Sequence, residues 1–315
     1  MTIGRAHIAR VRAGDKAVAV FSSGFNSASG HASLMVVDLG SGELLKRIRV
    51  PGAAQSLASP ALLDKDADGY VDYVYAGDDT GQLWRFDLTA ESVDDWGLSF
   101  GEQPLLAAQD NQPITAAPEI YKTADAQVMI YVGTGRYLGT SDKNSTALQS
   151  LYAVRDKWLG DLEASFEEPV KIDNLVQQSI TYEVENAALA GGGTATYPIR
   201  VTSALDVDYE SKHGWYIDLI PPSPASAQGE RINTTPVVRH GRLIFTTLIP
   251  PVSSCEFGGT GWLMEMDAIS GKRFDESVLD INGDARMDKN DMYANGTDQL
   301  SIGGRKFPEL IRPLS

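Results

Sequence analysis

The chain has 315 residues, of which 43% are hydrophobic, and a formal net charge of −15 at pH 7. That length and apolar content are enough for a sizeable core, in one large domain or two ordinary ones. The negative charge repels phosphate backbones and anionic lipids, so we expect neither nucleic acid nor a membrane surface as a partner. The sequence contains no run of about 18 apolar residues, so we expect no membrane insertion.

Three further features narrow the class of protein. Met1 stands directly before strand-like sequence, without the basic and apolar segments of a signal peptide, so we expect a piece of a longer protein. The single cysteine, Cys255, has no partner for an internal disulfide, and we interpret it as a packed side chain. The four histidines are scattered and have no cysteine nearby, which argues against a zinc site.

Short runs rich in Val, Ile, Tyr and Trp dominate the chain, and Gly, Asp, Asn and Ser separate them. Such runs predict β-strands in meanders or hairpins, whereas long helical periodicity is scarce. The sequence therefore predicts an all-β fold. Its clearest strands, in chain order, lie within residues 17–24, 33–42, 71–79, 128–135 and 242–251.

One pattern recurs along the chain: a large residue, two more residues, then a charged marker residue and a turn. The markers are separated by 49, 68, 63 and 49 residues. A repeat near 50 residues, with about four short strands in each copy, predicts the blades of a modified β-propeller. Five blades are legible, and the two tails leave room for up to seven. The five markers are Asp38, Asp87, Arg155, Asp218 and Asp267.

Prolines and insertions complete the predicted layout of one propeller domain over residues 1–315. Pro60, Pro118 and Pro236 each fit the entry to a strand, where the missing N–H is tolerated. The longer separations between markers imply loop insertions, and the most extensive covers residues 160–212. Long loops of a propeller gather on a face, where functional contacts usually lie.

The stretch "DKDADGYVD" concentrates four aspartates in nine residues. Hard oxygen ligands at alternating positions, with a glycine at position 6 for the turn, are typical of a Ca²⁺ loop. We expect a dication to offset the repulsion between these carboxylates, and Mg²⁺ fits less well because it prefers a compact octahedral shell. The predicted ligands of this main loop are Asp64, Asp66, Asp68, the carbonyl of Tyr70, and Asp72.

A second acidic run, "DINGDARMDKND", repeats the same offsets near the C-terminus. Ala285 occupies the glycine position, and an alanine at positive φ costs about 1 kcal/mol, so we expect weaker Ca²⁺ binding than in the main loop. The alternative is a polar surface loop. The predicted ligands of this second loop are Asp280, Asn282, Asp284, the carbonyl of Arg286, and Asp288, with Asp291 at position 12.

Three stretches together carry a family resemblance that covers most of the chain: "SPALLDKDADGYVDYVYAGDDTGQLWRFDL", "VGTGRYLG" and "TTPVVRHGRLIFTTLIPP…CEFGGTGWLMEMDAISG". They resemble the C-terminal domain of PilY/PilC-type type IV pilus tip-associated adhesins. The resemblance implies a modified β-propeller in the C-terminal part of a secreted Gram-negative protein. It implies that this protein is exported through the periplasm to the cell surface, at the pilus tip or outer membrane.

The same resemblance implies a non-enzymatic, calcium-binding role in fimbrium biogenesis, cell adhesion and virulence. Calcium occupancy of the Asp64–Asp72 loop would regulate pilus extension against retraction, and surface attachment. The implied partners are pilins and minor pilins, with a host-surface or abiotic-surface ligand in addition.

Two other functions remain open from the residues alone. The segment "GDDTGQLWRFDL" is similar to the tryptophan-bearing repeats of quinoprotein-like propeller dehydrogenases, although only the Asp87 and Asp218 segments fit well. A carbohydrate-binding propeller is the third reading. Nucleophile-elbow, phosphate-loop and dinucleotide-binding motifs are absent from the sequence. Trp84, Trp215 and Trp262 recur at blade positions, and we interpret them as packing between blades.

Overall fold

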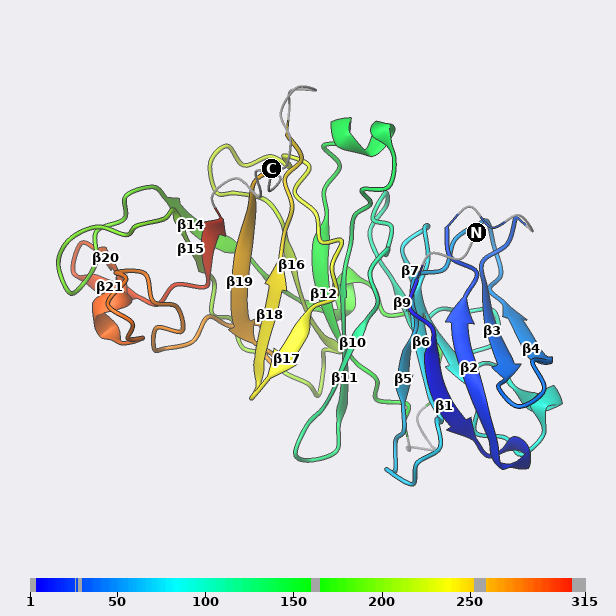
Figure 1. Cartoon of the computed structure of the whole chain (residues 1–315). Helices are drawn as coiled ribbons and strands as arrows, with labels where there is room; N and C mark the ends of the chain where they lie inside the picture. Colours follow the sequence, from blue (N-terminus) through cyan, green and yellow to red (C-terminus); the bar gives the residue numbers. More distant parts are fainter. Residues whose placement is uncertain (1–3, 26, 28–29, 160–164, 252–258, 308–315) are drawn as a thin grey trace. The chain divides into compact units, whose positions relative to one another are not determined.

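The computed structural model describes residues 4–25, 27, 30–159, 165–251 and 259–307 (Figure 1). The described chain consists of β-strands joined by turns and five short 3₁₀ helices, which confirms the predicted all-β class. Cys255 lies outside the described residues. The chain divides into two compact units, one of residues 1–134 and 154–171, and the other of residues 135–153 and 172–315. The single domain over 1–315 stays a prediction.

The first unit holds the N-terminal strands and two 3₁₀ helices. These helices are η1 (Ala13–Asp15) and η2 (Val93–Asp95). The strands are β1 (His7–Val11), β2 (Lys16–Ser22), β3 (Ser33–Asp38), β4 (Leu44–Arg49), β5 (Ala61–Leu63), β6 (Tyr73–Gly77), β7 (Gln82–Asp87), β8 (Gly97–Leu98), β9 (Leu106–Ala107), β10 (Glu119–Lys122) and β11 (Val128–Gly133).

The second unit holds the remaining strands, except that β12 (Ser150–Arg155) crosses the boundary between the units. Its 3₁₀ helices are η3 (Thr140–Asn144), η4 (Ile172–Asn174) and η5 (Lys289–Asp291). Its other strands are β13 (Val176–Gln178), β14 (Ile180–Val184), β15 (Ile199–Thr202), β16 (Gly214–Asp218), β17 (Val237–Arg239), β18 (Arg242–Thr246), β19 (Gly261–Asp267), β20 (Tyr293–Asn295), β21 (Asp298–Leu300) and β22 (Gly304–Phe307).

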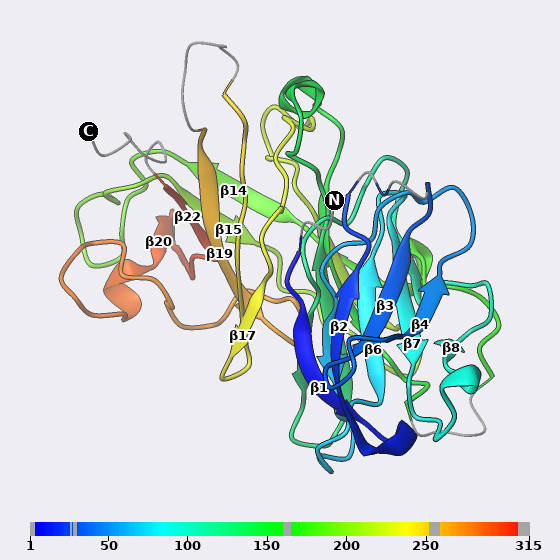
Figure 2. The same cartoon turned by 45° about the vertical axis from the view of Figure 1, so that its right-hand side comes forward.

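Two antiparallel sheets build the first unit, and β10 pairs with β11 as a further hairpin. One sheet has the order β1-β2-β3-β4, the blue strands of Figures 1 and 2. The other has the order β5-β6-β7-β8, with β9 also paired to β7. Alternate residues of β2 are buried, as expected for a strand with one face on the core. The shared core includes Val18, Val20, Val36, Val74 and Phe86.

The repeat predicted from the sequence corresponds to real strand boundaries. Each of the five charged markers is the last residue of a strand, namely of β3, β7, β12, β16 and β19. Each of the three marker prolines directly precedes the first residue of a strand, namely of β5, β10 and β17. A residue that ends a strand must turn the chain, and the Asp38 carboxylate does so by accepting the N–H groups of Gly40 and Ser41.

The correspondence between markers and sheets is less regular than the sequence predicts. The strand that ends at Asp218, β16, lies beside β12 and pairs in parallel with β13 on its other side. The markers Arg155 and Asp218 therefore belong to one sheet, and the five markers lie in four sheets. Parallel pairing needs a long connection, which the insertion between these two markers supplies.

Residues of the 160–212 insertion are part of the sheets of the second unit. β14 and β15 form a hairpin at one edge of a sheet with the order β14-β15-β22-β19-β18-β17. Ile199 and Val201 of this hairpin pack with Ile281 and Ile302 in a separate hydrophobic cluster. The insertion thus contributes both hydrogen-bonded strands and apolar core.

Buried tryptophans and buried ion pairs lie in the interior of each unit. Trp84, Trp215 and Trp262 are at most 3% exposed, so all three are packed in the interior, and their packing between blades stays a prediction. In the second unit, the Arg200 guanidinium donates to both oxygens of Glu230 at 2.7 Å and lies 3.9 Å from the ring centroid of Trp262. Paired in this way, two buried charges satisfy each other's hydrogen bonds.

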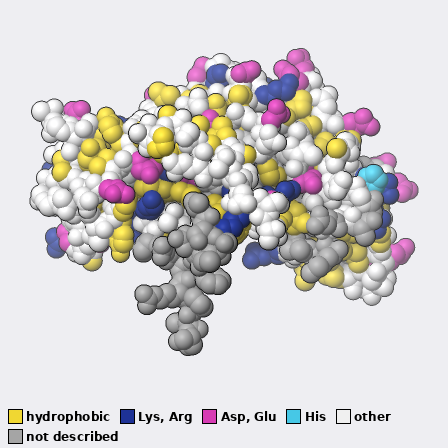
Figure 3. Space-filling model, turned by 90° about the horizontal axis from the view of Figure 1, so that it is seen from above, with side chains coloured by type: hydrophobic (Ala, Val, Ile, Leu, Met, Phe, Trp, Pro, Cys, Tyr) yellow, Lys and Arg dark blue, Asp and Glu magenta, His cyan; other side chains and the backbone are white. Residues whose placement is uncertain are grey.

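The surface carries charges of both signs. On the face drawn in Figure 3, acidic and basic side chains are interspersed among polar and apolar ones. Within the described part of the chain, no helix has the length and apolar character needed to cross a membrane.

The hydrogen bond between Trp84 and Asp78 offers a test of what stabilises the first unit. The Trp84 Nε1–H donates to Asp78 Oδ2 at 2.7 Å, and burial raises the pKa of this carboxyl although the bond opposes the shift. Trp96 has the same 3% exposure but donates to a neutral carbonyl, that of Ala90. Because bonds to charged groups contribute more, we expect Trp84→Phe to cost at least about 1 kcal/mol more than Trp96→Phe in chemical denaturation.

The pH dependence of the same pair of variants gives a second readout. Trp84→Phe removes a donor to Asp78 and so raises its pKa further, which penalises the charged form in the folded state. The deficit of Trp84→Phe should be fully present at neutral pH and shrink as the pH falls through the raised folded-state pKa values of Asp78 in the two chains, which lie above the ordinary value of 3.8. Equal losses for the two variants at every pH would contradict this account.

Candidate metal centre

The main acidic loop is the connection between β5 and β6. Leu63 and Tyr73 face each other in the ladder at its base, and the Asp72 N–H donates to the Leu63 carbonyl at 2.9 Å. The Val71 N–H donates to the Arg10 carbonyl at 2.9 Å, which ties the end of the loop to β1. The nine residues are therefore closed by one strand pair and docked on another strand.

Backbone N–H groups donate hydrogen bonds to three of the four carboxylates of this loop. Asp64 accepts from the N–H groups of Asp68 and Gly69, at 3.2 and 2.8 Å. Asp68 Oδ1 accepts from the Tyr70 N–H at 3.0 Å, and Asp72 Oδ2 accepts from the Lys65 N–H at 2.8 Å. Because Asp64, Asp68 and Asp72 each fix a neighbouring peptide, these aspartates shape the loop as well as charging it.

Three of the predicted ligands converge on one point. Oxygen atoms of Asp64, Asp66 and Asp72 all lie within 4.8 Å of one another. Carboxylate oxygens at this spacing are the donor set that a hard dication such as Ca²⁺ prefers. Asp72 is buried and Asp66 is exposed. The three carboxylates therefore converge at the protein surface, with Asp72 on the inner side.

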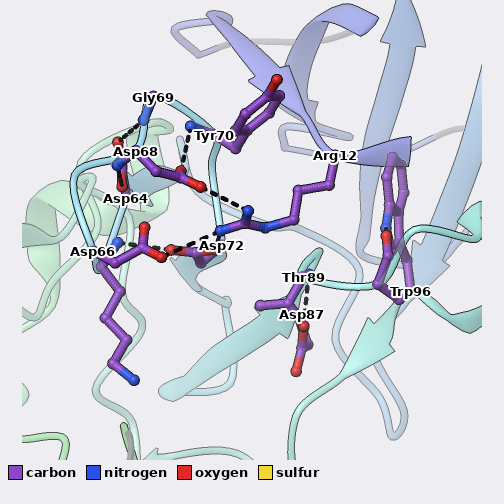
Figure 4. Close-up of polar contacts among 12 residues, drawn as sticks. Arg12, Asp64, Asp66, Asp68, Gly69, Tyr70, Asp72, Asp87, Thr89 and Trp96 are labelled. Carbon is purple, nitrogen blue, oxygen red and sulfur yellow. Dashed lines mark hydrogen bonds and ion pairs between the residues drawn. The ribbon is translucent and has the colours of Figure 1, made fainter. Parts of the chain in front are cut away.

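A guanidinium reaches into the same cluster from outside the loop. Arg12 follows β1 and makes ion pairs with three of the aspartates (Figure 4). Its Nη1 lies 2.6 Å from Asp68 Oδ2, and its Nη2 lies 3.4 Å from Asp66 Oδ2 and from Asp72 Oδ1. Asp68, the closest partner of Arg12, is the predicted ligand that lies outside the converging group of three. Arg12 was not among the predicted site residues, because no local pattern in the sequence links it to a loop some 50 residues away.

The surroundings shift the pKa values of two of these carboxyls in opposite directions. The Tyr70 N–H and the Arg12 guanidinium lower the pKa of Asp68, although partial desolvation opposes them. Burial raises the pKa of Asp72, although the Lys65 N–H and Arg12 oppose that shift. An unpaired negative charge therefore costs more free energy on Asp72 than on Asp68.

Tyr70 was predicted to contribute its carbonyl oxygen, and that role stays a prediction. The Tyr70 side chain makes contacts of its own, apart from the loop carboxylates. The hydroxyl donates to Asp15 Oδ1 at 2.8 Å, and the Arg10 and Arg12 guanidinium carbons each lie 5.4 Å from the ring centroid. Tyr70 thus packs the loop against η1 and the end of β1.

The second loop, between residues 280 and 291, repeats the backbone pattern of the first. Asp280 accepts from the N–H groups of Gly283 and Ala285, at 2.7 and 3.0 Å. Asp284 Oδ1 accepts from the Arg286 N–H at 2.8 Å, as Asp68 does from Tyr70. The two runs that the sequence analysis aligned therefore fold alike.

The buried acid of the second loop is Asp291. It is fully buried and accepts from the N–H groups of Ile281, Asn282 and Asp288. Since Ile281 and Lys65 both hold position 2 of their loops, Asp291 corresponds to Asp72. The predicted ligand Asp288 instead caps η5 by accepting from the Asn290 N–H at 2.7 Å.

The acidic side chains of the second loop do not converge as those of the first do. Within the described residues, no three of them bring an oxygen each within 4.8 Å of one another. Residues of the insertion lie against the loop, with the Ala190 N–H donating to the Met292 carbonyl at 2.9 Å. A Cβ on Gly191 would lie 2.5 Å from the Asn290 Cβ, so only glycine allows this approach.

Alanine at positive φ does not distinguish the two loops. Ala285 has φ 65°, as the sequence analysis expected, but Ala67 in the main loop has φ 61°. Gly69 and Gly283 hold the other left-handed position of each loop, at 93° and 81°. Each loop therefore has one alanine and one glycine at its two left-handed positions, in opposite order. The main loop differs by having Asp66 where the second has Asn282, and by Arg12.

These sheets and loops are those of a β-propeller-type fold with a cluster of converging carboxylates on one hairpin. The model of the PilY1 beta-propeller domain family matches residues 1–191, which include the main loop. The chain therefore belongs to the PilY1 beta-propeller family, as the sequence resemblance predicted.

Relatives and solved structures agree with this assignment. The chain is 31% identical to a type IV pilus biogenesis factor PilY1 homolog of Xylella fastidiosa, covering 96% of this chain and 21% of that protein. It is 29% identical to the type IV pilus biogenesis factor PilY1 of Pseudomonas aeruginosa, covering 94% of this chain and 28% of that protein. The chain thus spans about a fifth to a quarter of the length of these relatives.

The fold also matches a solved structure. The crystal structure of the Pseudomonas aeruginosa PilY1 C-terminal domain has a TM-score of 0.83 and 24% sequence identity. The match covers 98% of this chain and 67% of the solved chain. At this identity the likeness shows the fold, which is that of a PilY1 C-terminal domain.

The left-handed glycine of the main loop can be tested without metal. A Cβ at Gly69 meets no atom within 4 Å, so Gly69→Ala should cost only the backbone strain of a second left-handed alanine. We expect the free energy of unfolding to fall by about 1 kcal/mol in calcium-free buffer. Gly97 has equally open space but no positive φ, so Gly97→Ala should be neutral or slightly stabilising. Equal effects of the two substitutions would refute the strain argument.

Proposed function

We propose that this chain is the calcium-binding, non-enzymatic propeller domain of a type IV pilus biogenesis factor. In this proposal, calcium occupancy of the main loop regulates pilus extension against retraction, and surface attachment. The observation that carries the metal assignment is the convergence of Asp64, Asp66 and Asp72 within 4.8 Å. The names of the relatives carry the assignment to pilus biogenesis.

The chemistry of the donors favours Ca²⁺ over other metals. Every converging ligand atom is a carboxylate oxygen, and hard oxygen donors select Ca²⁺ or Mg²⁺ rather than zinc or copper. A loop of nine residues with donors at alternating positions suits the flexible shell of six to eight oxygens around Ca²⁺. Asp68 and the Tyr70 carbonyl would join the three converging carboxylates to complete that shell from the protein side.

The second loop is proposed as the weaker calcium site. Its aspartates have the same backbone scaffold, but Asn282 removes one charge relative to Asp66, and its acids do not converge. Affinity in loops of this type follows the number of charged ligands and the rigidity of the site. We therefore propose that it fills only at calcium concentrations above those that saturate the main loop.

Partners and location follow from the proposed role. We propose pilins and minor pilins as the protein partners, with a host-surface or abiotic-surface ligand for adhesion. We place the whole protein at the cell surface, at the pilus tip or outer membrane, after export through the periplasm. The family assignment supports these proposals, and calcium linkage offers the mechanism: an ion that binds one loop conformation stabilises every contact made by that conformation.

Matched substitutions in the two loops test the metal assignment. Asp68 and Asp284 hold the same position and accept the same type of backbone hydrogen bond. We expect Asp68→Ala to weaken calcium binding at least about tenfold, because it removes one charged ligand. Asp284→Ala should leave the tight site unchanged. Isothermal titration with CaCl₂, after removal of metal with a chelator, measures both.

Circular dichroism of the same metal-free variants provides the control for folding. Asp68→Ala should keep the wild-type spectrum, since its backbone partner is exposed and can bond to water. If the wild-type chain takes up no calcium at millimolar concentration, or if Asp68→Ala binds as tightly as wild type, the assignment of the main loop is wrong.

The regulatory part of the proposal is tested in cells. In a bacterium that carries the full-length protein in its type IV pilus system, surface piliation and pilus-driven motility should change between calcium-depleted and millimolar calcium medium. The Asp68→Ala strain should lose that response, and the Asp284→Ala strain should keep it. An unchanged calcium response in the Asp68→Ala strain, at equal protein level, would separate calcium binding from pilus regulation.

A further inference from the structure

The fold positions the Arg12 guanidinium beside the proposed calcium loop. Its neighbours Val11 and Ala13 are buried at 0% and 4% exposure, so the backbone that carries it is anchored in the core of the first unit. The hydrogen bond from the Val71 N–H to the Arg10 carbonyl joins that backbone to the end of the loop. The guanidinium is therefore held beside the aspartates by packing on both sides.

The contacts of Arg12 overlap with those that a bound cation would need. It pairs with Asp66 and Asp72, two of the three converging carboxylates, and most closely with Asp68. Among the described residues, the ion pairs of Arg12 do not include Asp64, which bonds instead to loop N–H groups. A guanidinium and a dication that share the same oxygens repel each other at short range, so they compete for these carboxylates.

We propose that Arg12 is a built-in competitor of calcium, which stabilises the metal-free loop and lowers its affinity for the ion. This inference rests on the proposed function of the main loop. In the metal-free state Arg12 offsets the repulsion among Asp66, Asp68 and Asp72. Calcium binding requires Asp68 to exchange the guanidinium for the ion. Arg12 thereby sets the calcium concentration at which the loop fills.

Arg10, which lies in β1 two residues before Arg12, offers a matched control. It carries the same charge, and its guanidinium carbon lies at the same 5.4 Å from the Tyr70 ring centroid as that of Arg12. Its ion pair is with Asp15, and no contact joins it to Asp64, Asp66, Asp68 or Asp72 among those of the described residues. Removing Arg10 therefore changes the net charge and the packing of Tyr70 without freeing a ligand.

Titration of the full chain with CaCl₂ tests the competition. We expect Arg12→Gln to lower the calcium Kd by about three- to tenfold and Arg12→Lys to restore much of the wild-type value, because partly exposed charge pairs are modest in energy. Arg10→Gln should change Kd by less than about twofold. The gain from Arg12→Gln should shrink as salt is raised, because the competition is between partly exposed charges.

Stability in the presence of a chelator gives the second readout. The metal-free Arg12→Gln chain should melt below Arg10→Gln, and saturating calcium should reverse that order. Calcium binding by wild type with an unchanged or weaker affinity in Arg12→Gln overturns the competitor role and leaves the calcium site intact. Absence of calcium binding in both wild type and Arg12→Gln overturns the competitor role and the proposed function together.

Discussion

Repulsion among carboxylates is the constraint on which the main loop depends. Four aspartates within nine residues cannot approach one another unless something offsets their charge, and the sequence alone suggested a dication for that purpose. The structure shows two further sources. Backbone N–H groups bond to Asp64, Asp68 and Asp72, and the Arg12 guanidinium reaches three of the four side chains. Groups of the protein itself therefore offset part of the repulsion, so the shape of the loop does not depend on a dication alone.

The two acidic loops use carboxylates and backbone N–H groups in the same way. Both use the carboxylate at position 1 to bind N–H groups across the turn, and both use position 5 to bind the N–H two residues on. Both place a buried aspartate against the N–H of position 2, although Asp72 and Asp291 come from different positions along their loops. The shared hydrogen bonds define a backbone scaffold, and the charges placed on that scaffold then decide how well it attracts a cation.

The sheets matter to function chiefly because they fix where the loops start and end. The hairpin of β5 and β6 closes the main loop, β1 from the neighbouring sheet contributes a carbonyl partner, and the residue that follows β1 is Arg12. The chain belongs to the PilY1 beta-propeller family, and the relatives it resembles are named type IV pilus biogenesis factors. Under the proposed calcium role, occupancy of the main loop would act beyond its own nine residues, because Tyr70, a proposed ligand through its carbonyl, also contacts Asp15 through its hydroxyl.

Much of the fold and part of the site followed from local sequence. The charged markers and prolines lie at strand ends because turns and strand entries impose chemical requirements on single residues, and those requirements are readable one residue at a time. The acidic loops were found for the same reason: ligand spacing along nine or twelve residues is a local property. Tertiary structure alone decided the rest. The parallel placement of β16, the equivalence of Asp291 with Asp72, and the arrival of Arg12 among the aspartates depend on contacts between distant segments, and such contacts are set by the packing of sheets, which leaves no periodic trace in the chain.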